Sequence, residues 1–241
     1  MTSESADMVR VGSVFTIHTK GIVGYSNVIN VKGSNDLFVY RMLDKTFFSV
    51  THTPDSDKRN GVHNLICSMS PKSCNANYFA LLLNSKHVQV TIESKHKENK
   101  RLGVPSIVSN IYVPVVEIEK QEAIGSLDVI CQFLEMNAIE KVYTIEYPAL
   151  KLGLFRELAE AIADEVYKTE QIKFFQLTFI HHWLLIYRSV NVEQYADGLK
   201  RELSEVGLLK CIEALFEKLV APRSELYANL MRYRIVRSIN D

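Results

Sequence analysis

The 241-residue chain lacks the motifs by which most enzyme families are identified from sequence. It contains no Walker A loop, no G-x-G-x-x-G fingerprint, no G-x-S-x-G nucleophile elbow and no H-E-x-x-H helix. Its 10 glycines do not cluster into a loop that would hold a phosphate group. We therefore expect a protein that is not an enzyme and that uses no cofactor.

An excess of charge is missing as well. Lys plus Arg and Asp plus Glu each total 28, so the net charge is zero at pH 7. The hydrophobic share of 47% and the charged share of 23% are close to the averages for globular proteins. This composition excludes a disordered chain, a collagen-like fibre and a basic tail that coats nucleic acid.

Long apolar runs and close cysteine pairs are absent too. The most apolar stretch, residues 174–187, is shorter than the roughly 20 residues of a membrane-spanning helix and contains two histidines. Residues 1–10 do not read as a secretory signal, so we expect a cytoplasmic protein without a membrane span. Reduced thiols are expected at the widely spaced Cys67, Cys74, Cys131 and Cys211.

The first half of the chain has the pattern of β-structure. Short segments rich in β-branched and aromatic residues alternate with turn residues, which predicts an antiparallel sandwich or barrel. In residues 87–92 the apolar side chains fall at Val88, Val90 and Ile92, which predicts a strand with one buried face. A helical turn is the alternative for residues 76–83. The predicted strands are residues 9–18, 22–32, 37–43, 46–53, 62–68, 78–83, 87–94 and 107–119.

The second half has helical periodicity. Helices are predicted over residues 127–136 and 149–168, from Asn191 to Gly207, and in two further segments up to the C-terminus. Residues 171–189 are apolar around the whole circumference, which predicts a helix in the middle of a bundle or, alternatively, a buried strand pair. We therefore predict an α+β protein. A β-rich region, residues 1–120, packs against a helical region, residues 121–241, as one compact unit.

One candidate site is nuclease-like. Glu93-Ser94-Lys95 ends a predicted strand, and Pro54-Asp55 lies upstream. This arrangement resembles the PD-(D/E)xK nuclease pattern, although Pro54-Asp55 falls in a polar turn, which departs from the family. The resemblance implies that Asp55 and Glu93 hold a divalent metal and that Lys95 stabilises the charge that develops on the phosphate. A metal-dependent nuclease is therefore one alternative function.

His63, Cys67 and Cys74 are the residues of a second, weaker candidate. Imidazole and thiolate are the ligands that zinc prefers, but a structural zinc site needs four of them, usually in two closely spaced pairs. His63 and Cys67 lie on one face of a predicted strand together with Leu65, which favours core positions. No metal is therefore expected here.

Basic side chains gather at two places. Lys95, Lys97, Lys100 and Arg101 lie at the tip of a predicted hairpin, and Arg234 and Arg237 share a face of the last predicted helix. Such patches bind RNA or DNA phosphates, so nucleic-acid binding is a second alternative function. Solvated surface charge is the plainer interpretation of both clusters.

The leading hypothesis is binding or assembly through protein–protein contacts, including self-association. The last helix contains Tyr227, Tyr233 and Arg234, and tyrosine and arginine are enriched at protein interfaces. The compact size, the neutral charge and the lack of motifs also fit a viral structural or accessory protein. We expect these three residues to contribute to the interface.

Overall fold

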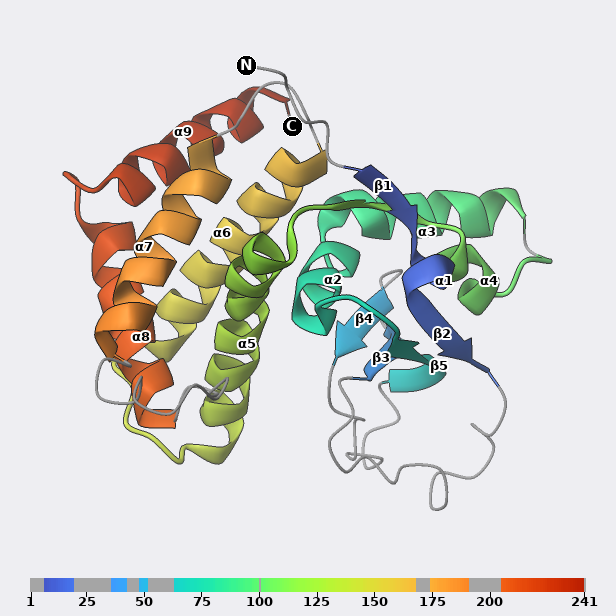
Figure 1. The fold of residues 1–241 in the computed structure, drawn as a ribbon, viewed down its shortest axis with the longest axis horizontal. Coiled ribbons are helices and arrows are strands. Elements are labelled where there is room, and N and C mark those ends of the chain that lie inside the picture. Colours follow the sequence, from blue (N-terminus) through green and yellow to red (C-terminus); the bar gives the residue numbers. More distant parts are fainter. Residues whose placement is uncertain are drawn as a thin grey trace. The chain divides into compact units, whose positions relative to one another are not determined.

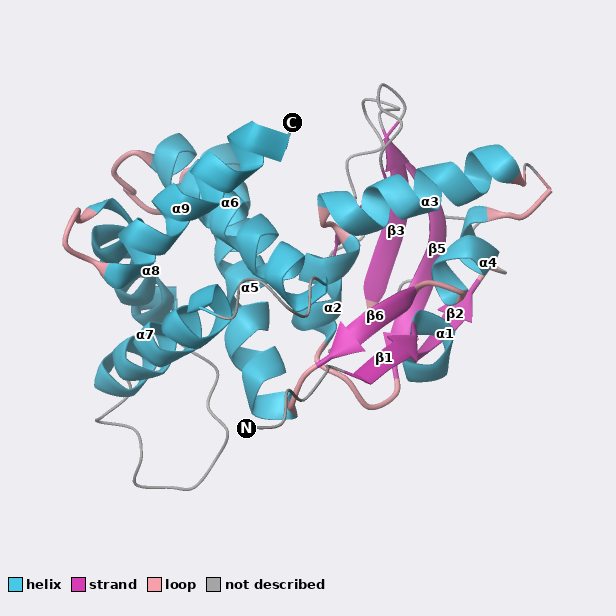
Figure 2. Cartoon of the chain, turned by 90° about the horizontal axis from the view of Figure 1, so that it is seen from above, coloured by secondary structure: helices cyan, strands magenta, loops and turns pink. Residues whose placement is uncertain are grey.

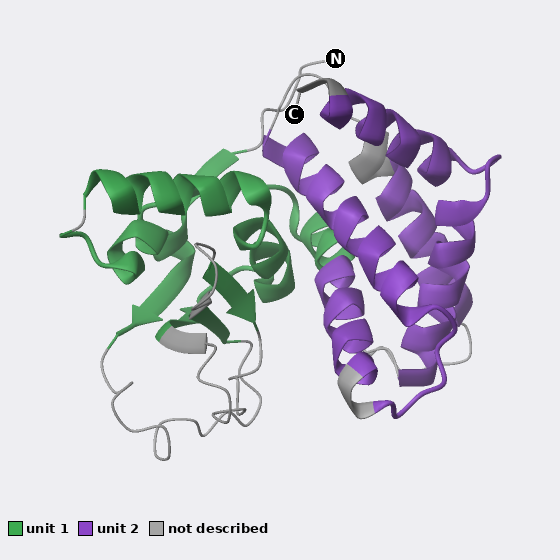
Figure 3. Cartoon of the chain, turned by 180° about the vertical axis from the view of Figure 1, so that it is seen from behind, with its two compact units in different colours: residues 1–125 green, residues 126–241 purple. Residues whose placement is uncertain are grey.

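A computed structural model describes residues 7–19, 36–42, 48–51, 63–99, 101–167, 174–190 and 205–240 (Figure 1). The chain divides into two compact units, Met1–Gly125 and Ser126–Asp241 (Figure 3). Antiparallel sheets lie in the first unit and helices make up the described part of the second. The predicted α+β class is confirmed.

Unit 1 contains two small antiparallel sheets. Strand β1 (Asp7–Arg10) pairs with β6 (Tyr112–Val115). The second sheet has the strand order β2-β5-β3-β4. A short helix, α1 (Val11–Val14), separates β1 from β2, so the single strand predicted over residues 9–18 is two strands in two sheets. The other strands are β2 (Phe15–His18), β3 (Leu37–Met42), β4 (Phe48–Thr51) and β5 (His63–Pro71).

Residues 76–83 form helix α2 (Ala76–Leu83), which confirms the helical alternative for this segment, and the strand predicted over 87–94 is helix α3 (Lys86–Glu98). Asn75 caps α2, because its Oδ1 accepts a hydrogen bond of 2.9 Å from the backbone N of Tyr78. In α3, Val88 and Ile92 are four residues apart and both buried, whereas Val90 is 51% exposed. The strand prediction was wrong here because a spacing of four fits both periods. Figure 2 shows α3 crossing the strands in projection.

The 107–119 strand prediction also fails in part. This segment contains the end of helix α4 (Val104–Ser109), the short strand β6 and the start of helix α5 (Ile118–Glu140). Gly125 of α5 lies close to the start of α2. A Cβ atom there would be 2.7 Å from Asn75 Oδ1 and 2.8 Å from the Tyr78 backbone N, so a side chain would force the two helices apart.

Two amide side chains cover the outer edge of β4: Asn84, which lies just before α3, and Gln89 of α3. The backbone N of Val50 donates to Asn84 Oδ1 at 2.9 Å, and Asn84 Nδ2 donates to the Val50 carbonyl at 2.8 Å. The backbone N of Phe48 donates to Gln89 Oε1 at 2.9 Å, and Gln89 Nε2 donates to the Leu83 carbonyl at 2.8 Å. The two amides take the place of a neighbouring strand and satisfy an edge that would otherwise attract another chain.

Unit 2 is built from helices. After the remainder of α5 come α6 (Pro148–Tyr167), α7 (Phe174–Val190), α8 (Glu205–Val220) and α9 (Glu225–Asn240). The helix predicted over 149–168 is confirmed as α6, and its apolar positions Phe155, Leu158 and Ile162 are fully buried. Most of the helix predicted from Asn191 lies outside the described residues, and Gly207, its predicted end, lies inside α8.

The apolar segment 171–189 forms helix α7 over its described part, Phe174–Val190. This helix packs against α6, α8 and α9, with Phe179 and Trp183 buried. Leu184 and Leu185 are 38% and 52% exposed, so the prediction of a helix buried on all sides was wrong. None of the helices that the structure describes combines the length and apolar composition that crossing a bilayer requires.

Gln89→Leu tests the amide cover of β4. Gln89 is 4% exposed, and leucine preserves its approximate volume while leaving the Phe48 N–H and the Leu83 carbonyl without partners. We expect the free energy of unfolding to fall by about 2 kcal/mol, measured by chemical denaturation. The control Lys95→Leu, at an exposed position of the same helix, should change it by less than about 0.5 kcal/mol. Equal effects of the two variants would contradict this role.

Candidate interaction surface

The connection between α5 and α6, residues 141–147, carries strongly exposed apolar side chains. Val142 is 63% exposed and Tyr147 is 68% exposed. Leu150, in the first turn of α6, is 52% exposed, and Met136 on α5 is 48% exposed. Exposed apolar side chains concentrated in one short stretch of a stable scaffold are candidates for a binding surface. We call residues 141–147 together with Leu150 the loop surface.

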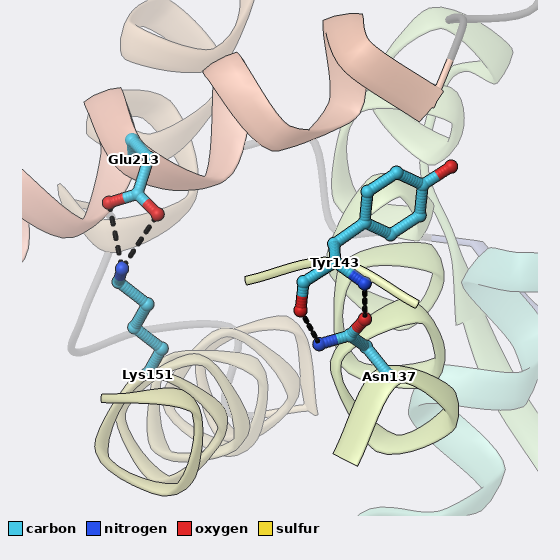
Figure 4. A network of polar contacts seen from close by, with 4 residues as sticks. All are labelled: Asn137, Tyr143, Lys151 and Glu213. Atoms are coloured by element: carbon cyan, nitrogen blue, oxygen red, sulfur yellow. Dashed lines mark hydrogen bonds and ion pairs between the residues drawn. The ribbon is translucent and has the colours of Figure 1, made fainter. Parts of the chain in front are cut away.

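Asn137 on α5 holds this loop by its backbone. The Tyr143 N donates to Asn137 Oδ1 at 2.7 Å, and Asn137 Nδ2 donates to the Tyr143 carbonyl at 3.0 Å (Figure 4). The Tyr143 ring lies 5.6 Å from the ring of Phe133, and its hydroxyl donates to Glu205 of α8. Ile145 is buried. Residues 143 and 145 therefore anchor the loop, while Val142 and Tyr147 face solvent.

Both ends of the loop have a left-handed backbone. Lys141 has φ 52° and Tyr147 has φ 51°, and they are the non-glycine residues with positive φ in the described chain. This conformation costs about 1–2 kcal/mol for a residue with a Cβ atom. Non-glycine residues held in this way cluster at functional sites, where the surrounding structure imposes the geometry. At Tyr147 the positive φ therefore coincides with an aromatic residue that is 68% exposed.

Lys151 fixes the first turns of α6 onto α8. Its Nζ lies 2.6 Å and 2.7 Å from the two carboxylate oxygens of Glu213 (Figure 4). The ammonium also lies 5.0 Å from the centre of the Phe216 ring, which adds a cation–π contact. The Lys151 side chain is 1% exposed and that of Glu213 is 49% exposed. The buried ammonium therefore depends on a carboxylate that water also reaches.

The residues predicted as an interface on α9 have other partners. Tyr233 is 5% exposed, and its hydroxyl donates to Asp164 of α6 at 3.0 Å. Burial, with Asp164 as a further cause, raises the pKa of Tyr233. Arg234 donates from Nε and Nη2 to the two carboxylate oxygens of Glu157, at 2.6 Å and 2.7 Å. Both residues join α9 to α6 inside unit 2, and Tyr227 is half-buried.

The predicted basic hairpin tip does not exist. Lys95 and Lys97 lie in the last turn of α3, and Arg101 lies in the turn that follows; all three are exposed. Lysines are common there, because the helix dipole favours positive charge at a C-terminus. Lys100 lies outside the described residues. Arg237 lies in the last turn of α9, in unit 2, so the structure places the two basic clusters in different units.

The nuclease candidate assumed a strand over residues 87–94, but these residues lie in helix α3. Glu93 and Lys95 are two positions apart on α3, a rotation of about 200° around the helix axis. Their side chains therefore lie on nearly opposite sides of the helix. Glu93 instead lies 3.7 Å from Lys97, one turn further on. Asp55 lies outside the described residues. The structure therefore does not bring Glu93 and Lys95 onto one face.

The cysteines of the zinc candidate lie in surroundings that disfavour metal binding. Cys67 is completely buried in β5, and burial raises the pKa of its thiol to about 12. Burial also raises the pKa of Cys74 to about 11, and metal binding needs the thiolate. The side chain of His63 lies outside the described part. Among the described residues there is no group of three or more His, Cys, Asp or Glu side chains suited to a metal ion.

The loop surface was not among the predicted sites. Tyr147 directly precedes α6, which begins at Pro148. In the structure, residues 142–145 alternate between exposed and inward-facing, but the sequence Val-Tyr-Thr-Ile does not alternate between polar and apolar residues. Nothing in that pattern shows that the residue before the helix has an exposed ring or a positive φ.

No model of a known protein family matches this chain, and neither a curated protein nor a solved structure matches it. The chemistry and geometry of the described residues therefore carry the functional argument.

The unequal exposure of Lys151 and Glu213 predicts unequal effects of replacing them. Glu213→Ala leaves an ammonium that is 1% exposed without its carboxylate, and we expect a loss of about 3 kcal/mol in the free energy of unfolding. Lys151→Met fills the same space with an apolar chain and leaves a half-exposed carboxylate that water solvates. We expect that loss to be about 1 kcal/mol or less. Urea denaturation of both variants measures the difference, and the reverse order would contradict it.

Proposed function

We propose that this protein binds other protein chains through the loop surface and acts in assembly rather than catalysis. One observation carries the proposal: Tyr147 is an aromatic residue that is 68% exposed, and its backbone is held at φ 51°. The Tyr147 carbonyl accepts a hydrogen bond of 3.0 Å from the backbone N of Lys151 at the start of α6, which needs no aromatic side chain. A contact with a partner explains both features.

Preorganisation supports the same proposal. A flexible loop loses conformational entropy when it binds, and a loop that is already ordered avoids much of that loss. Here the two hydrogen bonds of Asn137 and the burial of Ile145 order the loop within the free chain. Tyrosine is also among the residues that contribute most to binding energy at interfaces. Val142 and Leu150 supply apolar area beside it.

A reducing compartment fits the cysteines. All four are free thiols, and three of them, Cys67, Cys131 and Cys211, are buried. Burial raises the pKa of each of these three, so they resist oxidation as well as metal binding. We include a cytoplasmic location in the proposal on this ground.

Site-specific cross-linking tests the proposal. Replacing Leu150 by the photoreactive p-benzoylphenylalanine should give a discrete protein adduct in cells that express the chain. The control is the same replacement of Tyr112, which is 57% exposed in unit 1. Introducing Tyr147→Gly should abolish the Leu150 adduct. It should leave the melting temperature unchanged or higher, because glycine relieves a conformation that costs about 1–2 kcal/mol.

Two outcomes would contradict the proposal. The first is the absence of an adduct from Leu150, or an identical adduct from Tyr112. The second is a clear loss of stability in Tyr147→Gly, which would mean that the tyrosine serves the fold.

Nucleic-acid binding is a second proposal, limited to the end of α3. The supporting observation is that Lys95, Lys97 and Arg101 are all exposed within one helical turn and the turn that follows. Fluorescence anisotropy with a labelled single-stranded RNA should show binding that weakens as salt increases. The double variant Lys97→Ala with Arg101→Ala should reduce it, whereas Lys210→Ala, at an exposed position of α8, should not. Binding that salt does not affect would contradict this proposal.

A further inference from the structure

The loop surface carries two opposite charges that have no ion-pair partner among the described residues. Lys141 opens the loop and Glu146 lies next to its end, and both are exposed. Across the described ranges of the chain, neither side chain has an ion-pair partner. Val142 lies between them in the sequence, and Tyr147 follows Glu146. The surface therefore combines an apolar part with one positive and one negative side chain.

Three other acidic residues on the helices of unit 2 have partners among the described residues. Glu205 accepts a hydrogen bond from Tyr143, Glu213 pairs with Lys151, and Glu135 pairs with Arg156. Within the loop surface, the described charged side chains are those of Lys141 and Glu146, and their charges sum to zero. A strongly acidic or strongly basic partner would gain from one of them and be repelled by the other.

We infer that the partner of the loop surface is a second copy of this chain, related by a two-fold axis; this inference rests on the proposed function. In a two-fold interface the same patch faces itself, so residue i of one copy meets residue j of the other, and j meets i. Lys141 of each copy then pairs with Glu146 of the other copy. The apolar side chains of Val142 and Tyr147 pack around the axis between the two ion pairs.

The surface is self-complementary because of its charge pattern. A patch with two charges of the same sign would repel its own copy, whereas one charge of each sign attracts it when the copies are antiparallel. Met136 on α5 and Val206 at the start of α8 are 48% and 60% exposed next to residues that hold the loop. A stable interface buries roughly 800 Å² per partner, so a two-fold contact at the loop also covers side chains beyond it.

Charge exchange between copies tests the inference. Lys141→Glu gives a chain with two negative side chains at the paired positions, and Glu146→Lys gives a chain with two positive ones. Sedimentation velocity of the full chain should show a dimer that each single variant weakens at least tenfold. Mixing the two variants should restore the dimer, because each contact then joins a Glu to a Lys. Neither substitution changes the backbone strain, since Lys141→Glu keeps a Cβ atom at φ 52°.

The matched control uses Lys210→Glu and Glu217→Lys, which exchange charges at exposed positions of α8. These variants should remain dimeric, alone and when mixed. A wild-type chain that sediments as a monomer would overturn the inference, as would single loop variants that still form a dimer. If the Leu150 cross-link then joins a different protein, the proposed function stands and the self-association fails. If no cross-link forms at all, both fail.

Discussion

The two hydrogen bonds between the Asn137 amide and the Tyr143 backbone determine what the α5–α6 connection exposes. An amide side chain has one acceptor and two donor hydrogens, so it can satisfy the N–H and the C=O of one residue together. Once residue 143 is held, its ring packs near Phe133 and Ile145 turns inward. Val142 and Tyr147 are then exposed, and the positive φ of Tyr147 is part of the same arrangement.

The same chemistry occurs in unit 1 with the opposite consequence. Asn84 satisfies both backbone groups of Val50, and Gln89 binds the next outward N–H of β4, at Phe48. There the amides close a sheet edge against other chains. In unit 2 the amide holds a connection so that its apolar side chains remain accessible. An amide side chain bound to the backbone can therefore cover a surface or leave one accessible. The outcome depends on which side chains of the bound segment remain exposed.

The features that were predictable from sequence are those with an unambiguous period. In α6, apolar residues recur at helical spacing over about four turns, and no strand places Phe155, Leu158 and Ile162 on one face. In α3, by contrast, the spacing of Val88 and Ile92 fits both a strand and a helix. The burial of Gln89 and the exposure of Val90 are what a helix produces. The error at α3 carried over to the sites, because the nuclease and hairpin hypotheses both assumed a strand there.

The sequence by itself determined the α+β class, the helix of residues 148–167 and the absence of an enzyme motif. Each of these depends on the composition of a segment or on the spacing of apolar residues within it, and both can be read without knowing which residues meet in the fold. The tertiary structure decided which aromatic residues are exposed. Tyr233 and Tyr147 are both tyrosines in the helical half of the chain, yet one is 5% and the other 68% exposed. Asp164 and the helices around α9 enclose the first, whereas Asn137 and a left-handed backbone hold the second outward. Exposure is set by partners distant in the sequence, and a local pattern does not contain them.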